Sequence, residues 1–279
     1  MLNPSSLYSP RYLKEILGGI NLRETWGQHF LIDRNLQEKM VEEAGIKKGD
    51  PVLEIGAGVG TLTLQLLRKG AKVYAVEKDP RLSRILEEIL KPFPGLKIIT
   101  HDFLNLNLSS LLRKEKEWKI VSNPPYNLST TLISRLLEHP SRISLILLTL
   151  QREVAEKLLS PPGTKNYSLL TIRVNLYGKA ELVRKISPTV FFPPPRVDSA
   201  IIRITLQKRR KRKDERRILQ TAEKIFQKRR KMLHNVFPQL TEKDWNTLGI
   251  PPTLRGENLG IEELGKLARL LEEKGVLGN

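Results

Sequence analysis

Short apolar runs alternate with segments of helical period between residues 52 and 150, and this alternation is the strongest constraint on the fold. Residues 52–55, 73–76 and 96–100 have the length and composition of buried strands, and the helical segments 61–67 and 81–90 separate them. Short strands joined through helices form right-handed crossovers and a mostly parallel sheet. The sequence therefore predicts an open α/β sheet.

Four further strands follow in the sequence. Residues 120–122 and 144–150 add two strands, each followed by helix-like sequence. Residues 180–186 and 200–206 form a closing β pair around a proline-rich loop at 191–197. We therefore expect a mostly parallel sheet of seven strands with helices on its faces.

The two ends of the chain differ from this central part. The first 27 residues have no clear period, so we expect a basic arm that includes Arg11, Lys14 and Arg23. A helical pattern at 35–44 then places Leu36, Met40 and Val41 on one side.

The composition changes again after Leu206. No convincing strand follows, and apolar residues recur at helical spacing in 218–236 and 264–271. We predict a first domain over residues 1–207 and a small helical domain over residues 208–279.

The charge of the chain predicts a polyanionic partner. The sequence has 48 Lys and Arg against 30 Asp and Glu, a net charge of +18. Residues 208–231 hold 13 basic and 3 acidic side chains, so +10 of the +18 lies in 24 positions. Nucleic acid is the leading partner. The alternatives are a solvated linker of mixed charge and a lysine-rich thermophilic surface.

Composition argues against several other classes of protein. Without cysteine, the chain has no disulfide, thiol nucleophile or cysteine-bound metal, and its four scattered histidines have no metal-ligand spacing. We expect no metal. No run reaches the roughly 18 apolar residues that span a membrane, and the N-terminus has no secretory pattern. The sequence predicts a cytoplasmic protein.

Three successive predicted strands end in residues suited to a nucleotide-like ligand. The first runs into Glu54-Ile55-Gly56-Ala57-Gly58-Val59-Gly60, where glycines allow close backbone approach. The spacing departs from the G-x-G-x-x-G of dinucleotide sites. Glu77 ends the second strand and can accept from two ribose hydroxyls, while Asp102 follows the third and can accept from an adenine amine. An ordinary strand-end cap is the alternative for each acid alone.

Asn123-Pro124-Pro125-Tyr126 follows the predicted strand at 118–122, where open α/β sheets keep their chemistry. A side-chain amide, a proline that fixes a carbonyl direction and an aromatic ring together form a receptor for a planar base with an exocyclic amine. A proline-stiffened turn is the alternative explanation.

Together these motifs resemble S-adenosylmethionine-dependent methyltransferases with a Rossmann-like sheet, and more narrowly the KsgA family of ribosomal RNA adenine dimethyltransferases. Further motifs support the narrower resemblance. They are Gly27-Gln28-His29-Phe30-Leu31, Gln151-Arg152-Glu153-Val154-Ala155, Phe191-Phe192-Pro193-Pro194-Pro195-Arg196-Val197-Asp198-Ser199, Arg229-Arg230-Lys231 and Arg255-Gly256-Glu257-Asn258-Leu259.

The resemblance implies roles for individual residues. It implies that His29 and Leu31 border the methionine part of the cofactor and that Gly56 lies at its carboxylate or ribose side. Glu77 would bind the ribose and Asp102 the adenine. Asn123 would face the transferred methyl group. The target adenine falls to Asn123, Pro124, Tyr126 and Phe191. Two positions depart from the family pattern, since His29 stands where Asn is usual and Pro124 where Leu is common.

The chemistry of an adenine amine explains why such residues suffice. Its lone pair is delocalised into the ring, so acceptors must hold its protons and turn the lone pair toward the methyl group. The side-chain oxygen of Asn123 and the carbonyl of Pro124 are suitable acceptors, and Tyr126 and Phe191 would stack on opposite faces of the base. Displacement at a sulfonium needs alignment more than a general base.

The resemblance also implies a biological setting. Residues 1–207 would form the catalytic domain, and residues 208–279 would dock on the small ribosomal subunit and its 16S RNA. Arg229, Arg230 and Lys231 on a basic helix would contact phosphates, although such charges can also form a wet helix face. We expect a monomer. The alternatives are a large-subunit RNA methyltransferase like the Erm proteins and a non-catalytic assembly factor. DNA adenine methylation is disfavoured because no target-recognition insert is present.

Overall fold

A computed structural model describes residues 3–18, 20, 29–207 and 212–277, with the backbone alone at 212 and 213. The described residues divide into two compact units, residues 1–155 with 181–206 and residues 156–180 with 207–279. No helix in the described ranges is long and apolar enough to span a bilayer.

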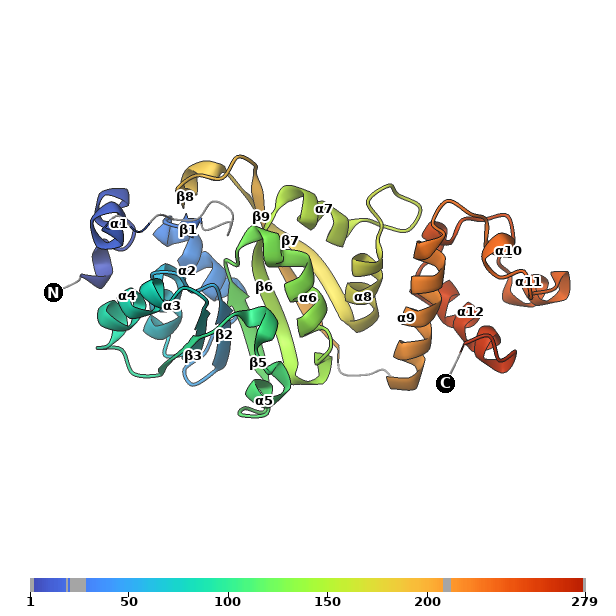
Figure 1. Cartoon of the computed structure of the whole chain (residues 1–279), viewed down its shortest axis with the longest axis horizontal. Helices are drawn as coiled ribbons and strands as arrows, with labels where there is room; N and C mark the ends of the chain where they lie inside the picture. Colours follow the sequence, from blue (N-terminus) through green and yellow to red (C-terminus); the bar gives the residue numbers. More distant parts are fainter. Residues whose placement is uncertain (1–2, 19, 21–28, 208–211, 278–279) are drawn as a thin grey trace. The chain divides into compact units, whose positions relative to one another are not determined.

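The first unit is built on the predicted seven-stranded sheet, and its strands have the order β4-β3-β2-β5-β6-β9-β7 (Figure 1). β2, β3, β4, β5 and β6 run parallel, and β9 pairs antiparallel with β6. The strands are β2 (Pro51–Ile55), β3 (Lys72–Glu77), β4 (Leu96–Thr100), β5 (Trp118–Ser122), β6 (Ile143–Gln151), β7 (Gly178–Ile186) and β9 (Ser199–Leu206).

Helices alternate with these strands, which is the predicted crossover pattern. α3 packs against β3, and α4 packs against β3 and β4. Asp79 caps α4 by accepting from the Arg81 N–H, and Pro80 fills the first helical position, where a missing N–H costs nothing. The helices are α2 (Arg34–Glu43), α3 (Thr61–Arg68), α4 (Pro80–Leu90), α5 (Leu108–Leu112), α6 (Ser129–Leu136) and α7 (Arg152–Leu159).

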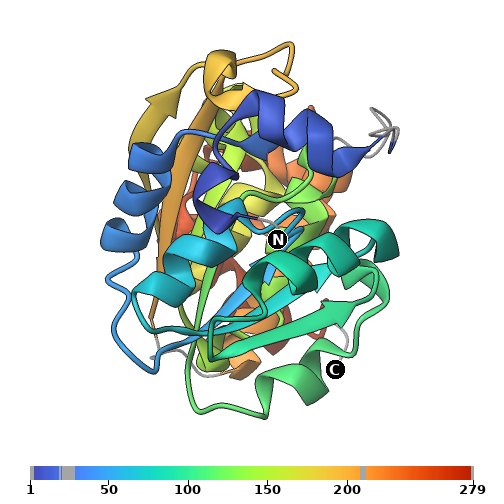
Figure 2. The same ribbon diagram turned by 90° about the vertical axis from the view of Figure 1, so that its left-hand side faces the viewer.

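The prediction of a basic arm at the N-terminus was wrong for the residues that are described. A short 3-10 helix, Pro4–Ser6, precedes α1 (Pro10–Leu17), which Ser9 caps. Leu7, Leu13 and Leu17 are buried in the core of the first unit. The Tyr8 hydroxyl also bonds the carbonyl of Thr61, so this segment lies against α3 (Figure 2). The apolar spacing is helical but covers only two turns, too few to register as a period. Arg23 lies outside the described residues.

The second unit is helical and has its own core. It contains α8 (Leu169–Tyr177), α9 (Arg212–Gln227), α10 (Leu233–Val236), α11 (Glu242–Leu248) and α12 (Ile261–Glu273). Tyr167, Ile172 and Leu176 are buried together with the apolar faces of α9 and α12. Because α8 shares this core, the unit begins earlier in the chain than the expected boundary at 207/208. The predicted helical stretch 218–236 is interrupted between α9 and α10.

Candidate active site

The carboxyl ends of β2 to β5 lie along one edge of the parallel sheet, and the predicted ligand-binding residues gather there. Gly56, Glu77 and Asp102 line one cavity of about 100 Å³. Gly56 and Glu77 also line a smaller cavity of about 40 Å³, where they meet residues from two distant parts of the chain: His29, Leu31 and Asn123. The structure therefore assembles all six predicted cofactor residues around two adjoining cavities. Gly27 and Gln28, the other part of the first motif, lie outside the described residues.

Glycine is required at the positions of the loop after β2 for different physical reasons. All three have positive φ, at 76° for Gly56, 58° for Gly58 and 89° for Gly60. A Cβ atom on Gly56 would lie 2.7 Å from Cδ of Pro125, and one on Gly60 would lie 2.4 Å from a methyl group of Leu86. The first glycine therefore lets the loop approach the Asn-Pro-Pro-Tyr segment, whereas the third lets α3 begin close against α4.

Glu77 is held in a fixed orientation by backbone donors. Its side chain is buried, with one oxygen accepting from the Gly58 N–H at 2.8 Å and the other from the Asp79 N–H at 2.9 Å. Burial raises the pKa of Glu77, while these backbone N–H groups act in the opposite direction. A carboxylate has about four lone-pair sites, so Glu77 can accept from a ligand as well as from these backbone donors.

Glu54 is a second buried carboxyl group in the smaller cavity, and sequence reasoning gave it no role of its own. It is 2% exposed and accepts from the Thr63 hydroxyl at 2.7 Å. Burial raises the pKa of Glu54 to about 8, with a smaller contribution from the charge of Glu77. Its place in the glycine motif was the available signal. Two carboxyl groups therefore border the space beside Asn123.

Asp102 enters the larger cavity already paired. Its carboxylate lies 2.8 Å from the Lys78 Nζ and accepts from the Leu104 N–H at 2.9 Å. The Lys78 interaction lowers the pKa of Asp102. Phe103 and Leu104 add apolar wall to the cavity. An ionised acceptor beside an apolar wall suits the edge and face of an adenine ring.

Asn123 has one polar atom engaged and one without a partner. Its Nδ2 donates to the backbone carbonyl of His29 at 2.8 Å, which fixes the orientation of the amide. Its Oδ1 is buried and has no hydrogen-bond partner in the described chain. A buried acceptor without a partner costs free energy, so it indicates a ligand donor. This geometry is what an acceptor for an amine requires.

Tyr126 is positioned by Ser199, which the sequence did not connect with it, and lies beside Phe191, which the sequence did. Its hydroxyl lies 2.6 Å from the Ser199 hydroxyl, and burial raises the pKa of Tyr126 to about 12, so the phenol stays neutral. The Phe191 ring meets Tyr126 edge-on, with centroids 6.3 Å apart and planes at 76°. The two rings are not parallel, so a base stacked on both would require one ring to turn. Ser199 lies at the end of the motif that contains Phe191, and that was the only available signal.

A small two-stranded sheet brings the distant motifs together. β1 (Phe30–Leu31) pairs antiparallel with β8 (Phe191–Phe192), with Leu31 opposite Phe191. Next to it, the His29 Nδ1 lies 2.8 Å from the Pro193 carbonyl oxygen. The sequence did not predict this sheet, because two-residue strands carry no periodic signal. This small sheet holds His29 next to Asn123. His29 stands in place of the usual Asn, and it takes part in the site through its backbone carbonyl, which orients Asn123.

The basic triplet differs from its predicted setting. Arg229, Arg230 and Lys231 follow the end of α9 and lie in a turn, so the prediction of a basic helix face was wrong. Arg229 is partly buried, with Nε 2.5 Å from Glu257 and another nitrogen 2.7 Å from the Lys165 carbonyl oxygen. Arg230 and Lys231 are exposed. The triplet therefore contains one structural cation and two exposed cations.

Metal ligands do not gather at this site. In the parts of the chain that the structure describes, no group of three or more His, Asp or Glu side chains is arranged to hold a metal ion.

The fold and the site together define a class I methyltransferase. The defining features are a mostly parallel sheet of this topology, a glycine loop after β2, an acid at the end of β3 and an amide-proline segment after β5.

The comparisons with known proteins identify the family. The model of the family described as ribosomal RNA adenine dimethylase matches residues 19–264, so the chain belongs to that family. Two relatives carry the name ribosomal RNA small subunit methyltransferase A. One, from Clostridium botulinum (strain Okra / Type B1), is 39% identical over 87% of this chain and 91% of its own length. The other, from Geobacillus thermodenitrificans, is 37% identical over 94% of this chain and 96% of its own length.

Solved structures support the same class. A dimethyladenosine transferase from Plasmodium falciparum has a TM-score of 0.73 with 28% identity, covering 86% of this chain and 96% of its own. The 23S rRNA methyltransferase ErmE has a TM-score of 0.68 with 26% identity, covering 87% and 99%. The small-subunit relatives are more similar in sequence than this large-subunit enzyme.

Proposed function

We propose that this protein transfers methyl groups from S-adenosylmethionine to the exocyclic amines of adenines in small-subunit ribosomal RNA. The observation that carries the proposal is the buried Asn123 Oδ1, which has no partner in the described chain while Nδ2 is held by the His29 carbonyl. Such an atom is an acceptor placed in advance for an amine proton. The names of the relatives support the RNA and the subunit as substrate.

The residues present fit S-adenosylmethionine. Glu77 has lone pairs for the ribose hydroxyls, Asp102 has an ionised acceptor for the adenine amine, and Gly56 lines both cavities. His29 and Leu31 border the space for the methionine part. When bound, the cofactor supplies an electrophilic methyl group on a sulfonium.

The protein's part in the reaction is alignment. Asn123 Oδ1 and the Pro124 carbonyl accept hydrogen bonds from the two N–H groups of the amine, which turns the nitrogen lone pair out of the ring plane toward the methyl group. Tyr126 stacks on the base, held by Ser199. The amine loses its proton to solvent after transfer, and no described side chain is needed as a general base. Released monomethyl amine can re-enter for a second transfer.

The second unit is proposed as the docking domain. The charge of +10 between residues 208 and 231 and the exposed Arg230 and Lys231 support phosphate contacts on the subunit. Because ribosomal particles are the proposed substrate, a cytoplasmic location is part of this proposal. The prediction of a monomer stays a prediction. A role in subunit assembly without catalysis is the alternative, and the intact site argues against it.

The test is methyl transfer with labelled cofactor. The protein is incubated separately with small subunits, large subunits and DNA, and labelled nucleosides are then mapped. We expect N6-methylated adenosines in the small-subunit RNA alone. Label in the large subunit would support the Erm-like alternative, and no label in any substrate would support the assembly factor.

A second test concerns the cofactor alone. Calorimetry of Glu77→Ala should show S-adenosylmethionine affinity lowered by about tenfold to a hundredfold, because the variant lacks the acceptor for the ribose hydroxyls.

A further inference from the structure

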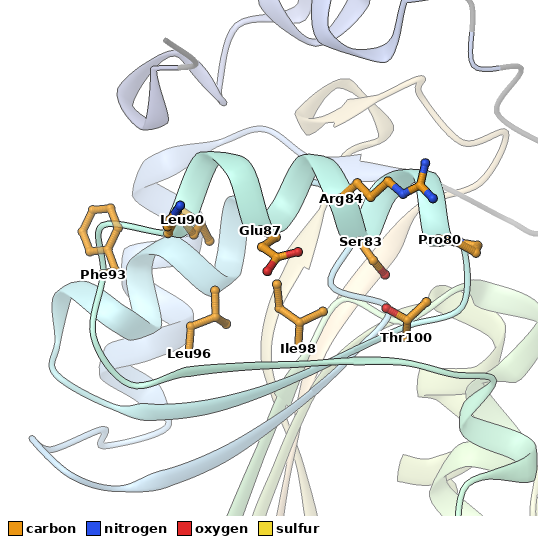
Figure 3. Close-up of a pocket in the computed structure, with 10 residues that line it drawn as sticks. Pro80, Ser83, Arg84, Glu87, Leu90, Phe93, Leu96, Ile98 and Thr100 are labelled. Carbon is orange, nitrogen blue, oxygen red and sulfur yellow. The ribbon is translucent and has the colours of Figure 1, made fainter.

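A groove lies between α4 and β4, and none of its lining residues lines either cavity of the candidate site. Its volume is about 430 Å³. α4 contributes Ser83 and Glu87, β4 contributes Leu96, Ile98 and Thr100, and Phe93 closes one end (Figure 3). We call this space the β4 groove. The methylation reaction described above gives it no role.

One wall of the β4 groove is an open strand edge. β4 is the last strand of the seven-stranded order and pairs with β3 only, among the described strands. Val73 donates to the Gly95 carbonyl and His101 donates to the Glu77 carbonyl. In a parallel ladder the residues that bond β3 therefore alternate with residues whose N–H and C=O groups point outward. The outward positions are Leu96, Ile98 and Thr100, the same three residues whose side chains line the groove.

This coincidence has a geometric consequence. A strand added beside β4 would bond these outward backbone groups, and every second side chain of that strand would enter the β4 groove under α4. Edge-strand addition of this kind is a common mode of peptide recognition, in which backbone bonds give affinity and alternating pockets give specificity. Proteins usually protect an open edge, and here a groove with both apolar and polar walls lies beside it instead.

Two polar side chains on α4 restrict the chemistry of the occupant. Ser83 is 5% exposed, and its hydroxyl oxygen is buried and has no hydrogen-bond partner in the described chain. The Glu87 carboxylate points toward β4, whereas Arg84 extends along the helix (Figure 3). Arg84 and Lys91 also line the groove and stand before and after Glu87 along α4, so the one carboxylate lies between two cations in the order of the helix. A chain of phosphates would meet the Glu87 carboxylate at its centre, which disfavours RNA.

We propose that the β4 groove binds an extended segment of a small-subunit protein, with a Lys or Arg facing Glu87 and apolar side chains on either side. The segment pairs with β4 and donates or accepts at Ser83. This inference rests on the small subunit as substrate. It adds a protein contact to the RNA contacts of the enzyme.

A pair of charge reversals tests the proposal by the sign of the effect. Glu87→Lys places a cation in the groove, whereas Glu88→Lys makes the same change on an exposed neighbour that does not line the groove. We expect Glu87→Lys to weaken binding to small subunits by about tenfold relative to Glu88→Lys. Thermal unfolding and S-adenosylmethionine affinity should match between the two variants. Equal binding by both variants, or tighter binding by Glu87→Lys, would overturn the proposal, and the latter would indicate RNA in the groove.

Cross-linking identifies the occupant directly. The chain has no cysteine, so Ile98→Cys provides a single attachment point for a benzophenone maleimide, and Lys116→Cys, an exposed residue outside the groove, is the control. We expect the probe at 98, but not at 116, to cross-link a ribosomal protein on small subunits. Cross-links to RNA alone, or none, would contradict the proposal. Wild-type methyl transfer in the same preparation keeps the two hypotheses apart, because its absence would contradict the proposed function instead.

Discussion

The amide of Asn123 depends on a residue 94 positions away in the sequence. Its nitrogen donates to the His29 carbonyl, and this leaves the oxygen free and buried beside the cavity. The side chain at position 29 takes no part in that bond. The change from the usual Asn to His at this position therefore preserves the contact that matters for the acceptor.

Asn123→Ala should abolish most methyl transfer while leaving cofactor affinity within a few-fold. The acceptor acts on the amine chiefly as it attacks, so its loss is expected to cost a factor on the order of 100 or more, by analogy with single-donor removal at oxyanion sites. Single-turnover transfer to small subunits and calorimetry with S-adenosylmethionine measure the two quantities. Near-normal turnover would contradict the assigned role.

The buried carboxyl of Glu54 predicts a pH dependence of folding. Its pKa of about 8 in the folded protein lies above the ordinary value of 4.5, so the unfolded chain loses this proton first. The contribution of Glu54 to the free energy of unfolding is therefore full below about pH 4.5 and declines as the pH rises toward 8.

Glu54→Gln should remove this decline because an amide does not ionise. In the absence of cofactor, the variant should be more stable than the parent at pH 8 by about 1 to 4 kcal/mol, since one pKa unit is worth about 1.4 kcal/mol. At pH 5 the difference should be small. Urea unfolding at both pH values measures it, and a parallel pH dependence in the two proteins would show that Glu54 is ionised without penalty.

At the scale of elements, glycines determine how closely helices and loops pack. Gly256, in a short 3-10 helix at Gly256–Asn258, is buried against α9, and a Cβ atom there would lie 2.0 Å from a methyl group of Ile225. Gly265 lies within α12, where a Cβ atom would lie 3.8 Å from its nearest neighbour. The same substitution should therefore have opposite effects at the two positions.

Gly256→Ala should destabilise the second unit by about 1 to 3 kcal/mol, because the buried site has no room for a methyl group. Gly265→Ala should stabilise it by up to about 1 kcal/mol through helix propensity. Urea unfolding of both variants measures the difference in free energy. Equal stabilities would show that the 3-10 helix can move away from α9 at little cost.

At the scale of the whole molecule, the net charge of +18 makes subunit binding dependent on salt. In the basic triplet, Arg229 has a structural role, whereas Arg230 and Lys231 can bind RNA. Arg229 bonds Glu257 and two backbone carbonyls, so its charge is already neutralised within the second unit. Arg230 and Lys231 are exposed and available for phosphate.

Neutralising Arg230 and Lys231 with Gln should weaken subunit binding and reduce the slope of its salt dependence by roughly 1.5, because each phosphate contact releases nearly one counterion. Neutralising the exposed Lys266 and Arg269 of α12 is the matched control for net charge. Arg229→Gln should instead lower stability by about 1 to 3 kcal/mol. Equal slopes for the two double variants would locate docking elsewhere.

The sequence by itself determined the sheet and the strand-end residues. Parallel strands and their crossover helices are local patterns of apolar residues, and motifs at strand ends must meet because all carboxyl ends of parallel strands lie on one side. Residues such as Gly56, Glu77 and Asn123 were therefore predictable without coordinates.

Only the tertiary structure decided the contacts that join separate motifs. Three contacts join residues that are far apart in sequence. They are the hydrogen bond from Asn123 to the His29 carbonyl, the pairing of β1 with β8, and the ion pair of Arg229 with Glu257. The inclusion of α8 in the second unit depends on a shared core in the same way. Such contacts depend on how faces pack in three dimensions, and a periodic pattern along one chain carries no information about which distant face it will meet.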